Sequence, residues 1–251
     1  MPATHSAKWN GQAVILAAGI GSRLGKLTAE SPKCMVQIGE MTIIERALAV
    51  LKSVGVSRVV VVTGFKRQIL EDYLATLSNG LELIFVHNPD YATTNNIYSL
   101  WLAQPHIASD FLLIESDVLF TRQMIVDLLD PCATSVSPLQ PWMNGTVLTL
   151  NADKQVSAIY LKNDPRPDAP LYKTVNLYSF DLKTWNEAVW PRLDRMVKRQ
   201  DLQVYYEVAI AEAVREGDLR LRGTICDVTT WYEVDTPEDL KAAGEILPHA
   251  E

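Results

Sequence analysis

The stretch from residue 13 to residue 36, AVILAAGIGSRLGKLTAESPKCMV, is the feature that most constrains how this chain folds. An apolar strand at residues 14–16 runs directly into a loop of small residues that contains Gly19, Gly21 and Gly25. Glycine lets a backbone come close to a bound group, and successive N–H groups in such a loop form a concave anion site. The stretch therefore predicts a strand followed by a phosphate-binding loop.

Two other glycine-rich nucleotide loops do not fit this spacing. A dinucleotide-binding fingerprint, G-x-G-x-x-G, needs its third glycine one position earlier than Gly25. The Walker pattern, G-x-x-x-x-G-K-[ST], needs a glycine at position 20 and a Ser or Thr at position 27, where this chain has Ile20 and Leu27. A plain tight turn remains the simplest alternative, but it does not explain the cations Arg23 and Lys33 that follow.

The whole motif, L-A-A-G-x-G-x-R-L followed by S-P-K, resembles the signature of nucleotidyltransferases that join a nucleoside triphosphate to a phosphorylated small molecule. The resemblance implies that the loop surrounds the triphosphate and that Arg23 and Lys33 act as catalytic residues at the reacting phosphorus. It also implies a set of nucleotide-binding residues in the loop and in a later asparagine segment, namely Leu16, Ala17, Ala18, Gly19, Gly21, Ser22, Asn95, Asn96 and Ser99.

Apolar runs alternate with helical patterns over the first half, which predicts an α/β fold with a mostly parallel, Rossmann-like sheet flanked by helices. The expected strands are 14–16, 58–63, 81–87 and 110–115, and the expected helices are 42–54, 66–77 and 98–103. The second half predicts a smaller antiparallel section beside the substrate. Its expected strands are 145–150, 156–161, 171–180, 219–228 and 231–234, with a helix over 201–216 and a last helix that begins at Thr236.

These patterns predict one nucleotidyltransferase domain over residues 11–251. Residues 11–130 form its nucleotide-binding half and residues 131–251 its acceptor-binding half. Residues 1–10 are polar and lack the apolar core of a secretory signal, so they are expected to form a short tail.

Two aspartates are candidate ligands for Mg²⁺. Asp117 ends the apolar run L-L-I-E-S-D, and Asp235 lies in W-Y-E-V-D-T-P-E-D. Mg²⁺ commonly takes one or two carboxylates together with substrate phosphates and water. In the nucleotidyltransferase family these two places supply the metal carboxylates, so the resemblance points to Asp117 and Asp235. A loop aspartate that caps a turn is the plainer alternative for Asp117.

The identity of the acceptor depends on four further features: the asparagine segment, Trp142, the Y-Y-E segment and W-Y-E-V-D. They resemble the bacterial phosphocholine cytidylyltransferases, in which aromatic and acidic residues enclose a quaternary ammonium. Aromatic faces within about 6 Å of a cation attract it. The resemblance implies the acceptor-binding residues Trp142, Tyr205, Tyr206, Glu207, Tyr232 and Glu233. Tyr206 also shares a helical face with Ile210 and Ala213, which leaves a core position open for it.

Other parts of the chain are closer to neighbouring branches of the family. L-I-E-S-D-V resembles the cytidylyltransferases that act on 2-aminoethylphosphonate, and V-D-T-P-E-D-L resembles the inositol-phosphate and sugar-phosphate branches. The leading hypothesis is therefore a Mg²⁺-dependent transfer from CTP to a small phosphorylated or phosphonylated amino alcohol, with release of pyrophosphate. A sugar-1-phosphate or inositol-phosphate nucleotidylyltransferase and a catalytically silent regulatory subunit remain as alternatives.

Composition excludes several other classes of function. The formal net charge is −7 and no basic cluster is present, which argues against a nucleic-acid partner. No apolar run reaches 18 residues, so no membrane insertion is expected. Three cysteines without a C-x-x-C pair favour a reducing, cytoplasmic setting. The expected partners are CTP and a small acceptor, with a homo-oligomer possible.

Overall fold

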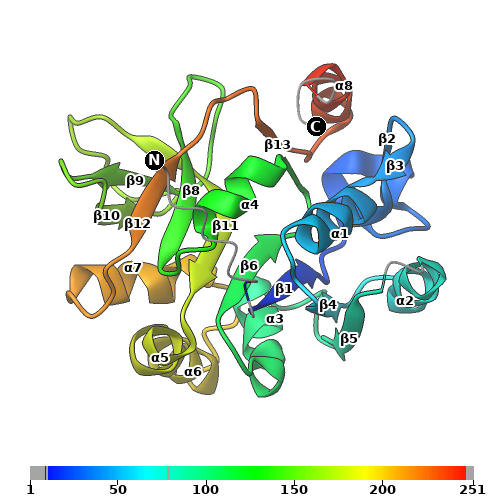
Figure 1. Ribbon diagram of the computed structural model, residues 1–251, viewed down its shortest axis with the longest axis horizontal. Coiled ribbons are helices and arrows are strands. Elements are labelled where there is room, and N and C mark those ends of the chain that lie inside the picture. The colour runs from blue at the N-terminus through cyan, green and yellow to red at the C-terminus, as the bar shows by residue number, and fades with distance from the viewer. Residues whose placement is uncertain (1–8, 10, 78–79, 247–251) are drawn as a thin grey trace.

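The computed structural model describes residues 9, 11–77 and 80–246, so the tail predicted at residues 1–10 lies outside it except for Trp9. Four strands form the parallel part of a central sheet in the order β6-β1-β4-β5 (Figure 1). They are β1 (Gln12–Ala17), β4 (Arg58–Thr63), β5 (Glu82–His87) and β6 (Phe111–Glu115). The expected parallel sheet is confirmed, and all six residues of β1 are buried because helices cover both of its faces.

An antiparallel section extends this sheet beyond β6 (Figure 1). Strand β11 (Tyr172–Phe180) runs antiparallel to β6, β8 and β9, and β12 runs parallel to β8. The other strands are β8 (Ala133–Pro138), β9 (Val147–Leu150), β10 (Val156–Tyr160) and β12 (Arg222–Ile225). Within the described residues the whole sheet has nine strands.

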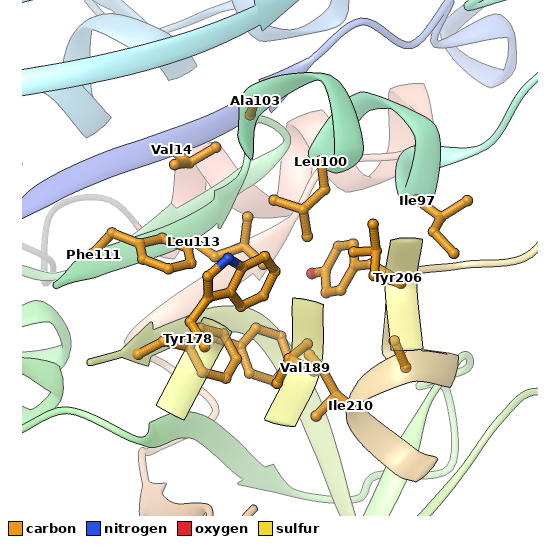
Figure 2. Packing of buried hydrophobic residues seen from close by; sticks show 14 of the residues in the cluster. Val14, Ile97, Leu100, Ala103, Phe111, Leu113, Tyr178, Val189, Tyr206 and Ile210 are labelled. Carbon is orange, nitrogen blue, oxygen red and sulfur yellow. The ribbon is translucent and has the colours of Figure 1, made fainter. Parts of the chain in front are cut away.

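Helices cover the two faces of the sheet and form two hydrophobic cores. One core lies under α1 (Ile43–Ser53), α2 (Arg67–Thr76) and α4 (Arg122–Leu128). The other lies under α3 (Asn96–Ala103), α6 (Trp190–Lys198) and α7 (Glu207–Arg215), where Leu100, Leu113, Tyr178 and Tyr206 pack together (Figure 2). Short helical segments complete the set: Ser22–Thr28, Lys33–Met35, Gln104–His106, α5 (Leu182–Thr184) and a π-helical turn at Trp185–Val189.

Two small sheets and α8 (Pro237–Ile246) pack against the end of the large sheet. Strand β2 (Gln37–Ile38) pairs with β3 (Met41–Thr42), and β7 (Val118–Phe120) pairs antiparallel with β13 (Trp231–Glu233). A third, smaller cluster that includes Leu24, Leu119 and Val234 joins the loop after β1 to this region. The β7–β13 pair therefore connects two segments that are more than one hundred residues apart in the sequence.

Helix α1 begins with a capping box, which the sequence T-I-I-E encodes locally. The backbone N–H of Glu45 donates to Thr42 Oγ1 at 3.2 Å, and the N–H of Thr42 donates to Glu45 Oε2 at 2.7 Å. We expect Thr42→Ala to lower the free energy of unfolding by roughly 0.5–2 kcal/mol, because it leaves a helix N–H without its partner. Urea unfolding should detect the loss and show Thr42→Ser close to wild type. Equal midpoints for all three proteins would contradict this role of the cap.

The second half departs most from the predicted elements. The helix expected over 201–216 begins only at Glu207, because the preceding segment contacts the asparagine loop instead: the N–H of Asn95 donates to the carbonyl of Leu202 at 2.7 Å. The strand expected over 219–228 is confined to β12. Strands β7 and β8 and helices α4 and α6 were not predicted. No helix of the described residues is long and apolar enough to cross a membrane.

Candidate active site

A cleft of about 660 Å³ opens at the carboxyl ends of β1 and β6, between the parallel and antiparallel parts of the sheet. Ligands of open α/β folds bind outside the carboxyl ends of parallel strands. All nine residues that the sequence predicts for nucleotide binding line this cleft, from Leu16 to Ser22 on one side and from Asn95 to Ser99 on the other. The structure thus brings together two segments that are nearly eighty residues apart.

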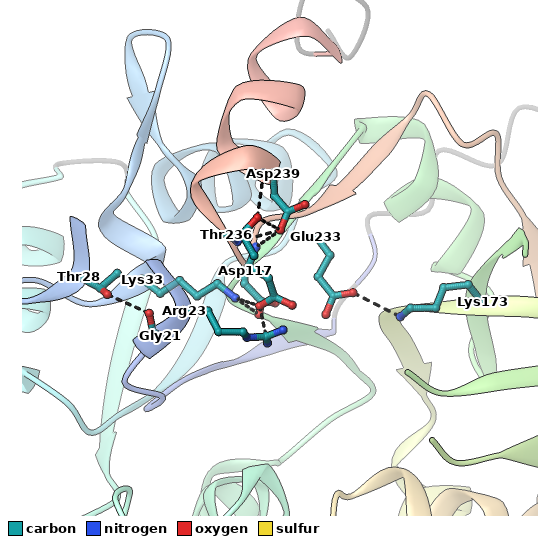
Figure 3. Close-up of polar contacts among 10 residues, drawn as sticks. Gly21, Arg23, Thr28, Lys33, Asp117, Lys173, Glu233, Thr236 and Asp239 are labelled. Carbon is teal, nitrogen blue, oxygen red and sulfur yellow. Dashed lines mark hydrogen bonds and ion pairs between the residues drawn. The ribbon is translucent and has the colours of Figure 1, made fainter. Parts of the chain in front are cut away.

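The glycine loop packs directly against the predicted catalytic lysine. Gly21 has a positive φ of 66°, and a Cβ atom there would lie 2.8 Å from the Cβ of Lys33. The Thr28 hydroxyl donates to the Gly21 carbonyl at 2.9 Å and so closes the loop (Figure 3). A residue with a side chain at position 21 would displace Lys33, so this glycine fixes both the loop and the lysine.

The two predicted metal ligands lie side by side because β7 pairs with β13. Asp117 immediately precedes β7, and the N–H of Val234 donates to its carbonyl at 2.9 Å. Lys33 Nζ bridges the two carboxylates, at 2.7 Å from Asp117 Oδ2 and 2.5 Å from Asp235 Oδ1 (Figure 3). Arg23, whose side chain is largely exposed, adds a second cation at 2.7 Å from Asp235 Oδ1.

A third carboxylate, that of Glu233, completes the acidic group. One oxygen each from Asp117, Glu233 and Asp235 lies within 4.8 Å of the others, which is a spacing that can hold a metal ion. Asp117 Oδ1 is buried and finds no hydrogen-bond partner among the described residues. An orphaned carboxylate oxygen in a group of three suits a hard divalent cation such as Mg²⁺.

The environment of Lys33 keeps its ammonium charged. Burial by itself lowers the pKa of this lysine, but the Coulombic attraction of Asp117 and Asp235 and the hydrogen bonds to them outweigh burial and raise it above its ordinary value. The positive charge is therefore fixed in place beside the acids before any ligand arrives.

The asparagine segment is held by protein contacts at the edge of the cleft. Asn95 caps α3 by accepting from the N–H of Asn96, and its amide donates to the carbonyl of Gln203. Asn96 donates to Glu115 Oε1 at 2.9 Å and accepts from the N–H of Tyr206 at 3.0 Å. These hydrogen bonds connect the asparagine segment, which is predicted to bind the nucleotide, to residues 203–206, which precede α7.

The six predicted acceptor residues fall into three places. Tyr205, Glu207 and Glu233 line the main cleft. Tyr206 instead is fully buried in the core, where its ring meets that of Tyr178 edge-on at 5.9 Å (Figure 2). Its core position follows from the helical face that it shares with Ile210 and Ala213.

The remaining two, Trp142 and Tyr232, line a side cavity of about 290 Å³. Trp231, Glu233 and Lys173 also line it, and the last two border the main cleft as well. The side cavity therefore adjoins the main cleft at Lys173 and Glu233. Trp142 is 69% exposed, so its ring is open to solvent in the absence of a ligand.

The structure adds further residues to the cleft that were not predicted from the sequence, among them Asn88, Glu115, Lys173 and Asn176. Glu115 lies two positions before Asp117, and the sequence predicts it only as the end of a strand. Lys173 and Asn176 carry no motif, and only the fold of β11 brings them to the cleft. Asn88 is buried, and its amide donates to Ser99 Oγ at 3.0 Å.

Burial raises the pKa of three carboxyl groups that line the cleft. Burial raises the pKa of Glu207 above its usual range and also raises that of Glu233, although Lys173 opposes the rise in both. Burial, with the charges of Asp117 and Glu207, raises the pKa of Glu115 well above its usual range. A bound cation would favour the ionised form of all three.

One cleft thus holds the glycine loop, the two cations Arg23 and Lys33 and an acidic group spaced to hold a metal ion, which is the arrangement expected for the site of a nucleotidyltransferase. Comparison with known proteins agrees. Residues 13–161 match the family described as the MobA-like NTP transferase domain. The chain belongs to this family, and it is an enzyme of the nucleotidyltransferase type.

Two sequence relatives and one solved structure are especially informative. The chain is 34% identical over 242 residues to CMP-5′-(3-aminopropyl)phosphonate synthase of Streptomyces rubellomurinus, and the match covers 92% of this chain but only 38% of that protein. It is 26% identical to choline-phosphate cytidylyltransferase of Streptococcus pneumoniae, over 94% of this chain and 98% of that one. The structure of CTP:phosphocholine cytidylyltransferase from the same species superposes with a TM-score of 0.80 at 25% identity, over 94% and 98% of the two chains.

Proposed function

We propose that the enzyme transfers CMP from CTP to a small aminoalkyl phosphonate or phosphate and releases pyrophosphate. The observation that carries this proposal is Glu207. It is only 6% exposed, it borders the cleft, and its Oε2 has no hydrogen-bond partner within the part of the chain that the structure describes. A buried carboxylate oxygen without a hydrogen-bond partner destabilises the fold unless a bound ligand donates to it. An ammonium group can donate such a hydrogen bond and also neutralises the charge. The names of both relatives described above support the same substrate class.

The charges of the cleft match an acceptor with an anionic end and a cationic end. The anionic end belongs near the triphosphate, beside Lys33 and the acids. The cationic end belongs near Glu207, which follows directly after Tyr206, whose N–H donates to Asn96 Oδ1. An aminoalkyl phosphonate carries both charges a few atoms apart.

The reaction follows from these positions. An oxygen of the acceptor's phosphonate or phosphate attacks the α-phosphorus of CTP. The bond from that phosphorus to the bridging oxygen of the β-phosphate breaks, and pyrophosphate leaves with the electron pair. The nucleophile is already ionised near neutral pH, so no residue has to remove a proton from it.

What the protein must supply is position and positive charge. The loop amides between Ala18 and Ser22 would bind the β- and γ-phosphates. Lys33 and Arg23 place two charges beside the acids, where charge builds on the transferring group. Asp117, Glu233 and Asp235 would hold Mg²⁺, which when bound polarises the α-phosphate oxygens.

The two cavities favour different head groups. A primary ammonium needs hydrogen-bond acceptors, which the main cleft offers at Glu207. A trimethylammonium cannot donate conventional hydrogen bonds and is better held by aromatic faces, which the side cavity offers at Trp142 and Tyr232. Because the unpartnered oxygen lies in the main cleft, we favour a primary amine over choline.

We expect two substitutions to separate these head groups. Glu207→Gln should lower kcat/KM for 2-aminoethylphosphonate roughly 10- to 100-fold, because it removes a charged hydrogen-bond partner, and should affect phosphocholine less. Trp142→Ala should raise the KM for phosphocholine more than for the amine and should leave the KM for CTP unchanged. Measured kcat/KM values for both substrates on both variants decide the point. Equal, small effects in all four cases would mean that neither residue contacts the acceptor.

Pyrophosphate release tests the function itself. CTP, UTP, dTTP and ATP should be paired in turn with 2-aminoethylphosphonate, phosphocholine, inositol phosphate and glucose 1-phosphate. We expect the highest kcat/KM for CTP with the aminoalkyl phosphonate. Preference for glucose 1-phosphate or inositol phosphate would establish one of the neighbouring activities instead, and turnover with no pair would point to a silent subunit.

A further inference from the structure

Strand β11 is interrupted where it borders the cleft. One edge pairs with β8 at Tyr172–Thr174 and again at Tyr178 and Ser179, with a register shift between the two stretches. The opposite edge pairs with β9 at Tyr172 and Lys173 and with β6 from Leu177 to Phe180. Between these two ladders the N–H of Thr174 donates to the carbonyl of Thr146 at 3.2 Å, and an opening without strand pairing follows at residues 175–176. Lys173 precedes this opening and Asn176 lies in it, and both line the cleft.

The backbone of Asn176, which lies in this opening, has a strained conformation. Its φ is +60°, in the left-handed region that residues with side chains seldom adopt, and the register of β11 against β8 shifts around it. Such strained positions and bulges re-aim side chains and gather at ligand sites. The bulge turns this stretch of β11 toward the cleft instead of toward a neighbouring strand.

Lys173 is the buried cation of this segment. Its side chain is 4% exposed, its Nζ donates to the carbonyl of Thr174 at 2.6 Å, and the same nitrogen lies 3.4 Å from Glu233 Oε2 (Figure 3). An ammonium has three protons, and a contact of 3.4 Å is a loose one. The nitrogen therefore retains capacity for another acceptor in the cleft, and the adjacent Gly145 leaves space beside its Cε and Nζ atoms.

The cations of the cleft divide between its two sides. Lys33 and Arg23 come from the loop side and contact Asp117 and Asp235. On the antiparallel side, the cleft is lined by two lysines among the described residues, Lys162 and Lys173. Lys162 is exposed, whereas Lys173 is buried and fixed by two partners, so its charge is preorganised and poorly screened.

We propose that Lys173 binds the anionic oxygens of the acceptor, the phosphonate or phosphate group that attacks CTP. This assignment rests on the proposed function and deepens it. Lys173 draws one acceptor oxygen toward the β11 side, and its contact with Glu233 places that oxygen beside the acidic group. Glu207 then binds the ammonium. The two ends of the acceptor are thus bound by two buried side chains of opposite charge, Lys173 at the anionic end and Glu207 at the cationic end.

The test compares three probes that carry one end or both ends of the acceptor. Isothermal calorimetry should measure binding of 2-aminoethylphosphonate, methylphosphonate and ethylamine to wild type, Lys173→Gln, Lys173→Met and the control Lys183→Gln, which changes an exposed lysine outside the cleft. The amide of Lys173→Gln can still donate to Thr174, so this variant keeps a local bond if Lys173→Met fails to fold. Thermal melting checks folding, and the CTP KM checks the nucleotide side.

We expect both neutral variants to bind 2-aminoethylphosphonate and methylphosphonate roughly 10- to 100-fold more weakly, because a charge-assisted hydrogen bond is lost. Ethylamine binding, the CTP KM and the Lys183→Gln variant should stay within about threefold of wild type, since none of them involves the anion at Lys173.

Wild-type affinity for the two phosphonates in a folded Lys173→Gln protein would overturn the assignment, as would an equal loss in the Lys183→Gln control. Failure of the proposed function has a different signature. Wild type would then release no pyrophosphate with any aminoalkyl acceptor, whatever Lys173 does.

Discussion

Lys33→Ala is expected to lower kcat by roughly 10²- to 10³-fold while the protein stays folded. Lys33 is a fixed cation that touches both metal-site aspartates, and loss of one preorganised charge-stabilising donor commonly has an effect of this size. Because the charge acts on the transition state, kcat should fall more than the KM values rise. Steady-state pyrophosphate release with saturating CTP and acceptor measures the effect.

Lys26→Ala is the matched control. Lys26 lies in the same loop and is exposed, so its removal should change kcat less than threefold. Thermal melting of both variants separates lost chemistry from lost structure. Activity of Lys33→Ala within a few-fold of wild type would remove this lysine from the mechanism.

Asp117→Asn and Asp235→Asn are each expected to lower kcat at least 10- to 100-fold and to raise the Mg²⁺ concentration needed for half-maximal rate. A neutral amide is a poor ligand for a hard cation, and even residues that only orient metal ligands have effects of this size. The substitution also leaves Lys33 with one carboxylate partner instead of two. Titration of Mg²⁺ at saturating substrates measures both changes.

Asp153→Asn, an exposed turn residue, is the control that should leave the Mg²⁺ titration unchanged. If Asp117→Asn or Asp235→Asn also gave the wild-type titration, that aspartate would be structural. Glu233, the third member of the group, would then be the remaining candidate for a metal ligand.

The first half of the fold could be predicted well because its signals are local. The β-branched run that becomes β4 was placed at its observed ends, and the capping box marks the start of α1. The glycine loop could be recognised because its function depends on backbone shape, which glycine spacing encodes directly. In these segments the local conformation is determined by residues that are close together in the sequence.

The parts that failed depend on long-range contacts. Nothing between residues 201 and 206 indicates that this segment pairs with the asparagine loop, so the helix was expected to begin too early. Lys173 and Asn176 reach the cleft only because β11 changes its partner from β9 to β6. Tyr205, Tyr206 and Glu207 are adjacent in sequence, yet only the start of α7 decides that Tyr206 faces the core while its two neighbours face the cleft.

The metal site is an intermediate case. The resemblance to known nucleotidyltransferases pointed to Asp117 and Asp235, but spacing alone could not bring together two residues that are 118 positions apart. The β7–β13 pair explains how they meet, and it also brings in Glu233, which the sequence had suggested only for the acceptor.

Direct cytidylyl transfer to the acceptor can be tested by following the phosphorus atoms of both substrates. Wild-type enzyme should be incubated with CTP, Mg²⁺ and 2-aminoethylphosphonate and followed by ³¹P nuclear magnetic resonance. We expect one pyrophosphate for each acceptor consumed, together with a new phosphonate–phosphate anhydride whose two phosphorus signals are coupled to each other. Pyrophosphate that appears with free CMP and unchanged acceptor, or a product in which the acceptor phosphorus is not bonded through oxygen to CMP, would contradict direct cytidylyl transfer at this site.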